Sequence, residues 1–72
     1  MMSINDARAV RDLSLRAIEN LTEALNAASV TADADTLERI RKGVGISIGT
    51  IDERLLSFLY QLHPELDHLK NK

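Results

Sequence analysis

The sequence has no cysteine and no tryptophan, and it has only one proline, one phenylalanine and one tyrosine in 72 residues. Without cysteine, neither disulfides nor thiolate zinc clusters can brace the fold. Aromatic residues make up 3% of the chain, so it lacks the stacking platforms that single-strand nucleic-acid binders use. Because so short a chain buries a modest share of its surface, we expect oligomerisation to support the fold.

Long apolar runs are also missing. The longest weakly polar run, residues 44–51, is about eight residues long, whereas a membrane-spanning helix needs roughly 20. The N-terminal residues 1–6 have neither the charged leader nor the apolar core of a signal peptide. Together with the absence of cysteine, these features predict a cytoplasmic protein that does not enter the membrane.

Neither sign of charge dominates, since 9 basic and 11 acidic residues give a formal net charge of −2. The charges are interspersed, so no long-range field steers the chain toward nucleic acid. The local basic group Arg39, Arg41 and Lys42 spreads over about 160° of a helix. Dimerisation would add the arginines of the first predicted helix, Arg8, Arg11 and Arg16. A nucleic-acid-binding regulator with such a composite basic face is therefore the alternative function.

A capping pattern predicts where the first helix begins. Ser3 places a hydroxyl before the helix and Asp6 a carboxylate three residues later, a variant of the capping box. Apolar residues then recur every three or four positions, at Val10, Leu13, Ala17, Leu21, Ala24 and Ala28, with Ile18 and Leu25 alongside. This pattern predicts a helix over residues 4–28 that frays near residues 26–29.

The second helix carries the strongest periodic signal. Thr31, Asp33 and Asp35 are capping residues, and so short a connection favours two antiparallel neighbouring helices. The apolar positions after them are Leu37, Ile40, Val44, Ile48, Ile51, Leu55, Phe58 and Leu62. Their steps average about 3.6 residues, the α-helical period, so we predict a helix over residues 34–62.

Three glycines disfavour a regular helix over the second predicted segment. Gly43, Gly45 and Gly49 each cost about 1 kcal/mol relative to alanine inside a helix. The alternation of apolar residues across 44–48 also fits a short strand and an α-β-α layout. We favour a helix, bent at the glycines, because an isolated strand needs a partner strand. The spacing of Gly45 and Gly49 also suits a close helix crossing, either within the hairpin or across a dimer axis.

Other apolar residues fall outside the main stripe. Gly49, Leu56 and Tyr60 cluster on one side of the predicted helix and suggest a second interface. Pro64 ends the second helix and suits the first turn of a new short one over residues 64–69. Leu66 and Leu69 would then cover the end of the bundle, and residues 70–72 would form a solvated tail.

The residues with metal-binding or acid–base capacity have ordinary explanations. His63, Glu65, Asp67 and His68 form the densest metal-capable set, but a helix C-terminus attracts histidine through its dipole. The carboxylate pairs Asp33/Asp35 and Asp52/Glu53 sit where caps and solvated faces place acids. We therefore predict no catalytic, cofactor-binding or metal-binding residues, and a protein that is not an enzyme.

The C-terminal part carries a resemblance. Residues 48–52, the pair Leu55 and Leu56, Tyr60 and the His-Pro-Glu-Leu-Asp run at 63–67 resemble the ending of small uncharacterised bacterial proteins. The match covers about a quarter of the chain and implies no known activity. The layout is also similar to that of the plasmid-encoded RNA-binding hairpin Rop, a dimeric four-helix bundle. No motif matches Rop, so the similarity is one of shape and its RNA-binding residues are not carried over.

The sequence thus predicts one all-α domain, an antiparallel helical hairpin that dimerises into a four-helix bundle. The predicted function is an oligomeric protein-interaction or regulatory module whose partner is a second copy of itself or another protein. The predicted oligomer interface comprises Val10, Leu21, Leu25, Val44, Gly45, Ile48, Gly49, Ile51, Leu55, Phe58 and Leu62.

Overall fold

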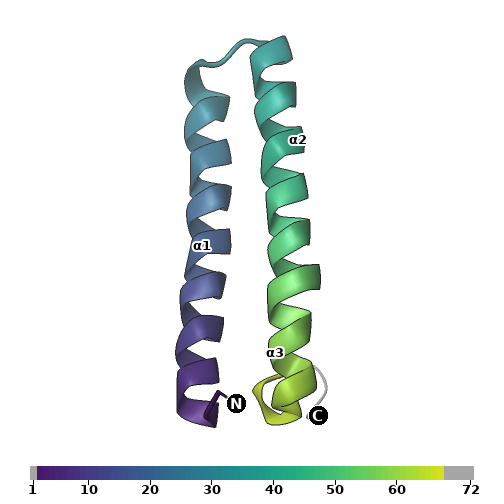
Figure 1. Ribbon diagram of the computed structural model, residues 1–72. Helices are drawn as coiled ribbons and strands as arrows, with labels where there is room; N and C mark the ends of the chain where they lie inside the picture. Colours follow the sequence, from purple (N-terminus) through teal and green to yellow (C-terminus); the bar gives the residue numbers. More distant parts are fainter. Residues whose placement is uncertain (1, 68–72) are drawn as a thin grey trace.

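A computed structural model of the chain describes residues 2–67, and helices form nearly all of this part. Two long helices lie side by side and run in opposite directions (Figure 1). In chain order the elements are α1 (Ile4–Thr31), α2 (Ala34–Thr50), the π-helix η1 (Ile51–Leu56), α3 (Ser57–Leu62) and the 3₁₀-helix η2 (Pro64–Leu66). The predicted all-α class is confirmed, and residues 2–67 contain no strand.

Side-chain caps set where both long helices begin. The Ser3 hydroxyl accepts a hydrogen bond from the Asp6 backbone N–H at 3.2 Å. The Asp33 carboxylate accepts one from the Thr36 backbone N–H at 2.7 Å. Each bond satisfies a donor that the first helical turn leaves without a partner in the helix. The first and second helices therefore begin where the capping residues predict, at Ile4 and Ala34.

The predicted end of the first helix is wrong. Instead of fraying near residue 28, α1 continues to Thr31, and the Ala32 N–H donates to the Ala28 carbonyl at 2.9 Å. Alanine has the highest helix propensity of any residue, so Ala27 and Ala28 extend the helix where the apolar pattern weakens. Only Ala32 and Asp33 connect α1 to α2.

The core lies at the end of the molecule where the described chain ends. Ala7 from α1 packs there with Leu56, Leu59 and Leu66. The half-buried residues around this cluster are Ile4, Val10, Ile18, Ile51 and Tyr60. Leu66 is buried by the turn after Pro64, as the sequence predicts, whereas Leu69 and the predicted tail at 70–72 lie outside the described residues. The structure describes the predicted 64–69 turn only as far as residue 67.

The elements α2, η1 and α3 follow one another without a break and form one continuous helical rod, which we call the second rod, with α1 as the first. The π-helix changes which apolar residues of the second rod face inward. After Ile51 the next buried position is Leu56, five residues later, followed by Leu59. A π-turn holds one more residue than an α-turn. The inward-facing positions that follow it are therefore shifted by one residue along the sequence. Leu59 is 1% exposed, whereas Phe58, a predicted interface residue, is 53% exposed.

The glycine segment is helical. Gly43, Gly45 and Gly49 all lie within α2, and none of them has a positive φ. The α-β-α alternative is therefore wrong for this chain. The hydrogen bonding changes from α-helical to π-helical over Ile51–Leu56, after the last glycine, rather than at the glycines themselves.

Candidate interaction surface

The predicted interface residues do not share one environment. Val44 is buried, and six others are half-buried within the helix pair: Val10, Leu21, Leu25, Ile48, Ile51 and Leu62. Four are exposed: Gly45, Gly49, Leu55 and Phe58. Most residues of the predicted oligomer interface therefore face the interior of a single chain. The four exposed ones all come from the second rod.

The glycines do not mark a close crossing between α1 and α2. A Cβ atom built on Gly43, Gly45 or Gly49 would meet nothing within 4 Å. The small-residue spacing therefore has no packing role inside the single chain. The prediction of a crossing within the hairpin is wrong. A contact across a dimer axis stays a prediction, as does the interpretation that the helix simply tolerates these glycines.

An apolar groove runs between the two rods on the side of Gly49. Its lining comes from α1, α2, η1, α3 and the end of η2, and consists of Leu15, Ile18, Ile48, Gly49, Asp52, Leu56, Tyr60 and Asp67. Its volume is about 390 Å³. The sequence places Gly49, Leu56 and Tyr60 on one side of a helix, and the structure brings all three to this groove. Sequence reasoning missed Leu15 and Ile18, which reach the groove from the other helix.

Tyr60 gives the groove a titratable hydroxyl. Partial burial raises its pKa, and the carboxylates of Asp67 and Asp52 add to this increase, whereas the Arg11 guanidinium opposes it. The groove thus combines an apolar lining with negative charge at its rim. Such a surface suits an occupant with apolar contact area and positive charge.

Large apolar side chains are also exposed away from the groove. Leu13 on α1 and Ile46 on α2 are 61% and 71% exposed. Leu55 and Phe58 are exposed on the side of the second rod that the π-helix turns away from the core. Single exposed apolar residues are common, but here they occur on both rods of a very small protein.

The basic group does not form a uniform positive patch. Arg39 and Lys42 line a shallow hollow together with Asp35 and Glu38. Arg41 forms an ion pair with Glu38 at 2.9 Å. Carboxylates therefore offset much of the local positive charge that would attract a phosphate backbone.

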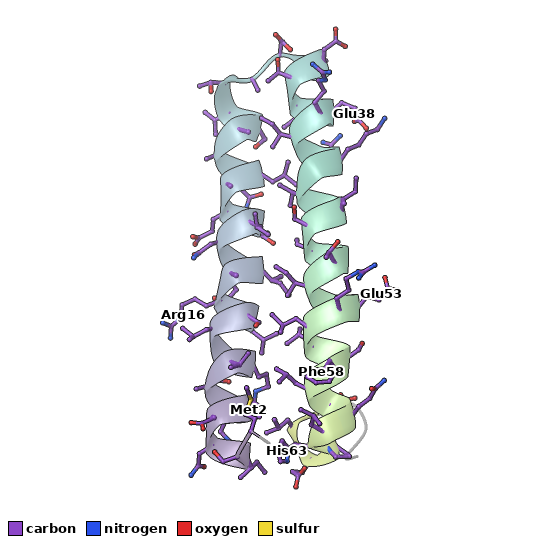
Figure 2. All side chains as sticks on the ribbon, viewed as in Figure 1. Met2, Arg16, Glu38, Glu53, Phe58 and His63 are labelled. Atoms are coloured by element: carbon purple, nitrogen blue, oxygen red, sulfur yellow. The ribbon has the colours of Figure 1, made fainter. Side chains whose placement is uncertain are left out.

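The arginines of α1 spread around that helix. Arg16 points away from α2 (Figure 2). The Arg11 guanidinium instead lies between the Asp12 carboxylate, 2.9 Å away, and the Leu66 carbonyl, to which it donates at 3.2 Å. Arg8 donates to the side-chain oxygen of Asn5 at 3.2 Å.

The metal-capable residues do not converge in the described part of the chain. His63 Nδ1 lies 4.0 Å from the Glu65 carboxylate, and its Nε2 lies 3.3 Å from the Met2 carbonyl oxygen. Across residues 2–67, no three histidine, aspartate or glutamate side chains gather as a metal site would require. His68, the fourth member of the predicted set, lies outside the described residues.

The two acidic pairs have separate environments. Asp33 caps α2, and its pKa is lowered because its carboxylate accepts the Thr36 N–H. Asp52 lines the groove, whereas Glu53 projects from the second rod away from α1 (Figure 2).

No helix within residues 2–67 has the length and apolarity needed to cross a membrane.

Comparison of the chain with protein-family models, with curated proteins and with solved structures finds no match. The resemblance of residues 48–67 to small bacterial proteins therefore stays a prediction. The exposed apolar side chains and the groove are the features of residues 2–67 that suit a binding partner.

Proposed function

We propose that this protein is a self-associating helical interaction module, in which two copies of the hairpin assemble into a four-helix bundle. The observation that carries the proposal is the amount of surface one chain leaves uncovered. Its accessible surface is 5407 Å², whereas a compact monomer of 8.0 kDa exposes about 4,450 Å². A standard dimer interface buries about 800 Å² on each partner, which is comparable to this excess.

The shape of the molecule supports the same proposal. The chain measures 45 × 25 × 16 Å along its principal axes, so it is elongated rather than globular. Its radius of gyration is 14.9 Å, whereas a compact domain of this length has about 11 Å. A single layer of two helices leaves both of its broad faces open. Stacking a second pair on one face gives the two-layer architecture that stable helical domains share.

The proposed partner is a second copy of the chain, and a further protein would bind the face that dimerisation leaves open. The proposal assigns the chain no catalytic activity and no cofactor. A cytoplasmic location agrees with the absence of cysteine. The alternative, nucleic-acid binding, gains no support from a basic group that carboxylates partly neutralise.

Sedimentation equilibrium at micromolar concentration tests the proposal directly. We expect a mass of twice the 8.0 kDa of one chain, with dissociation on dilution. Urea unfolding should depend on protein concentration, because dissociation and unfolding are then coupled. A compact monomer that stays monomeric at 100 times the working concentration would overturn the proposal.

A further inference from the structure

One side of the second rod combines open space with charges of both signs. Residues at steps of three or four lie on one side of a helix, and the set here, which we call the glycine stripe, is Glu38, Lys42, Gly45, Gly49 and Asp52. The two glycines at its centre have nothing within 4 Å of a built Cβ. Gly49 and Asp52, at the C-terminal end of the stripe, also line the apolar groove.

The charges on this stripe differ on the two sides of the glycines. Lys42 lies one turn before Gly45, and Asp52 follows Gly49. Glu38, one turn before Lys42, pairs with Arg41 beside the stripe at 2.9 Å. Figure 2 shows Glu38 and Glu53, at opposite ends of this segment, pointing from the rod away from α1. Lys42 and Asp52 are ten residues apart, roughly 15 Å along a helix, so they cannot pair within one chain.

A second copy in antiparallel orientation brings Lys42 and Asp52 together. When two such rods cross between Gly45 and Gly49, positions equally far from residue 47 lie opposite each other. Lys42 of one copy then faces Asp52 of the other. A parallel crossing would set like charges against each other, which is unfavourable. Two-fold symmetry repeats each favourable contact on both sides of the axis.

We infer that the dimer forms through this groove face, with the two α2 helices antiparallel and crossing at Gly45 and Gly49. Lys42 of each copy lies over the end of the partner's groove that Asp52 and Asp67 line. Leu15 and Tyr60 then lose solvent contact, and the absence of a Cβ at the glycines lets the backbones approach. This inference rests on the proposed function and adds the face, the orientation and the ion pairs.

A charge-swap cycle tests the orientation. We expect Lys42→Glu and Asp52→Lys each to raise the dimer Kd on the order of tenfold, because each places like charges opposite each other at two symmetry-related sites. The double variant Lys42→Glu/Asp52→Lys should return the Kd to within about threefold of wild type. Such a rescue has no explanation within one chain, because the two positions are too far apart to interact.

The matched control places a charge swap on the far side of α1. Arg16 points away from α2 (Figure 2), and Glu23 lies two turns further along the same side. Arg16→Glu and Glu23→Lys, singly or together, should leave the Kd within about twofold of wild type. An effect as large as that of Lys42→Glu would show that net charge, rather than the proposed pairing, controls association.

Glycine substitutions test the close approach. Gly45→Leu and Gly49→Leu place a side chain in open space, so the single chain should fold with an unchanged or higher melting temperature. Both should abolish dimers at micromolar concentration. Gly43→Leu is the control, because Gly43 lies off the stripe by more than a quarter turn and its variant should keep the wild-type Kd.

The single tyrosine supplies a direct readout of the face. Tyr60 lines the groove, and the sequence contains no tryptophan to mask its fluorescence. We expect acrylamide quenching of Tyr60 to fall as dimers form. A wild-type chain that never dimerises overturns both this inference and the proposed function. A dimer that is insensitive to the swaps and the glycine variants, with unchanged quenching, overturns this inference alone.

Discussion

The Ser57 hydroxyl donates a hydrogen bond to the carbonyl oxygen of Asp52, 3.0 Å away and five residues earlier in the chain. The Ser57 backbone N–H donates to the same oxygen, which is the i→i+5 pattern of a π-helix. This turn makes the step from Ile51 to the next buried residue, Leu56, five residues long. It therefore decides which leucines of the second rod form the core.

Alanine substitutions at Leu59 and Leu55 test this assignment with the same chemical change. Leu59 is 1% exposed and Leu55 is 37% exposed. We expect Leu59→Ala to lower the free energy of unfolding by about 2–5 kcal/mol, since it leaves a cavity. Leu55→Ala should cost less than about 1 kcal/mol. Urea unfolding at one fixed protein concentration measures both, and the reverse order of the two costs would refute the π-helical register.

Deleting Glu53 tests the π-helix itself. Removing one residue from η1 turns the five-residue step into a four-residue step, so Leu56 and Leu59 still face α1 in a continuous α-helix. We expect this variant to unfold cooperatively, with a free energy of unfolding within about 1 kcal/mol of wild type.

The control for this deletion is the removal of Glu19 from the regular helix α1. That deletion rotates one half of α1 by about 100° relative to the other half and takes Ile18 or Leu21 out of the interior. Cooperative unfolding should then be lost. Equal loss of stability in the two deletions would show that the π-turn does not absorb the missing residue.

The residues around this turn also show how far the sequence could predict the fold. The 3.6-residue period places Val44 and Ile48 toward the interior, where the structure has them. It fails after Ile51, because averaging over seven steps hides a single five-residue step. Residues 55–62 offer apolar side chains on two adjacent sides, so local pattern alone cannot choose between them. Packing against Ala7 and Leu66, both distant in sequence, makes that choice.

The groove was only half predictable for a related reason. Gly49, Leu56 and Tyr60 lie on one side of a helix by spacing, so the sequence could bring them together. Leu15 and Ile18 line the same groove from α1, and this pairing depends on how two rods lie in register. The two-residue connection and the core cluster set the register of α1 against the second rod. Helical periodicity predicts neither of them.

Arg11 ties the C-terminal turn to α1, and its removal should loosen that turn. Its guanidinium donates to the Leu66 carbonyl at 3.2 Å, and its side chain is largely buried. We expect Arg11→Ala to lower the free energy of unfolding by about 1–3 kcal/mol, because a charged hydrogen bond and aliphatic packing are both lost. Amide hydrogen exchange at Leu66 should accelerate in parallel.

A matched arginine on the same helix is the control for Arg11. Arg8 is exposed and donates to the side chain of Asn5, so Arg8→Ala should change the free energy of unfolding by less than about 0.5 kcal/mol. Comparable losses in the two variants would mean that the contact with Leu66 contributes nothing beyond a surface charge.

Asp33 makes the start of α2 sensitive to acid. Its carboxylate accepts the Thr36 N–H, and this hydrogen bond holds its pKa below the usual value. A lowered folded-state pKa means that the unfolded chain binds the proton more readily. The stabilisation is therefore complete above the ordinary carboxyl pKa and is lost as the pH falls through the folded value. We expect Asp33→Ala to lower the Tm at pH 7 and Asp33→Asn to retain most of it, because asparagine also caps helices.

The pH dependence separates the charge of Asp33 from its capping geometry. Below about pH 4 the wild-type Tm should fall toward that of Asp33→Asn, since protonation removes the charge that strengthens the hydrogen bond. Other carboxylates titrate equally in both proteins, so the difference between their Tm curves isolates Asp33. Thermal melts followed by circular dichroism from pH 2 to pH 7 measure this difference. Parallel curves over the whole range would show that the Asp33 charge does not stabilise α2, and that its cap acts through geometry alone.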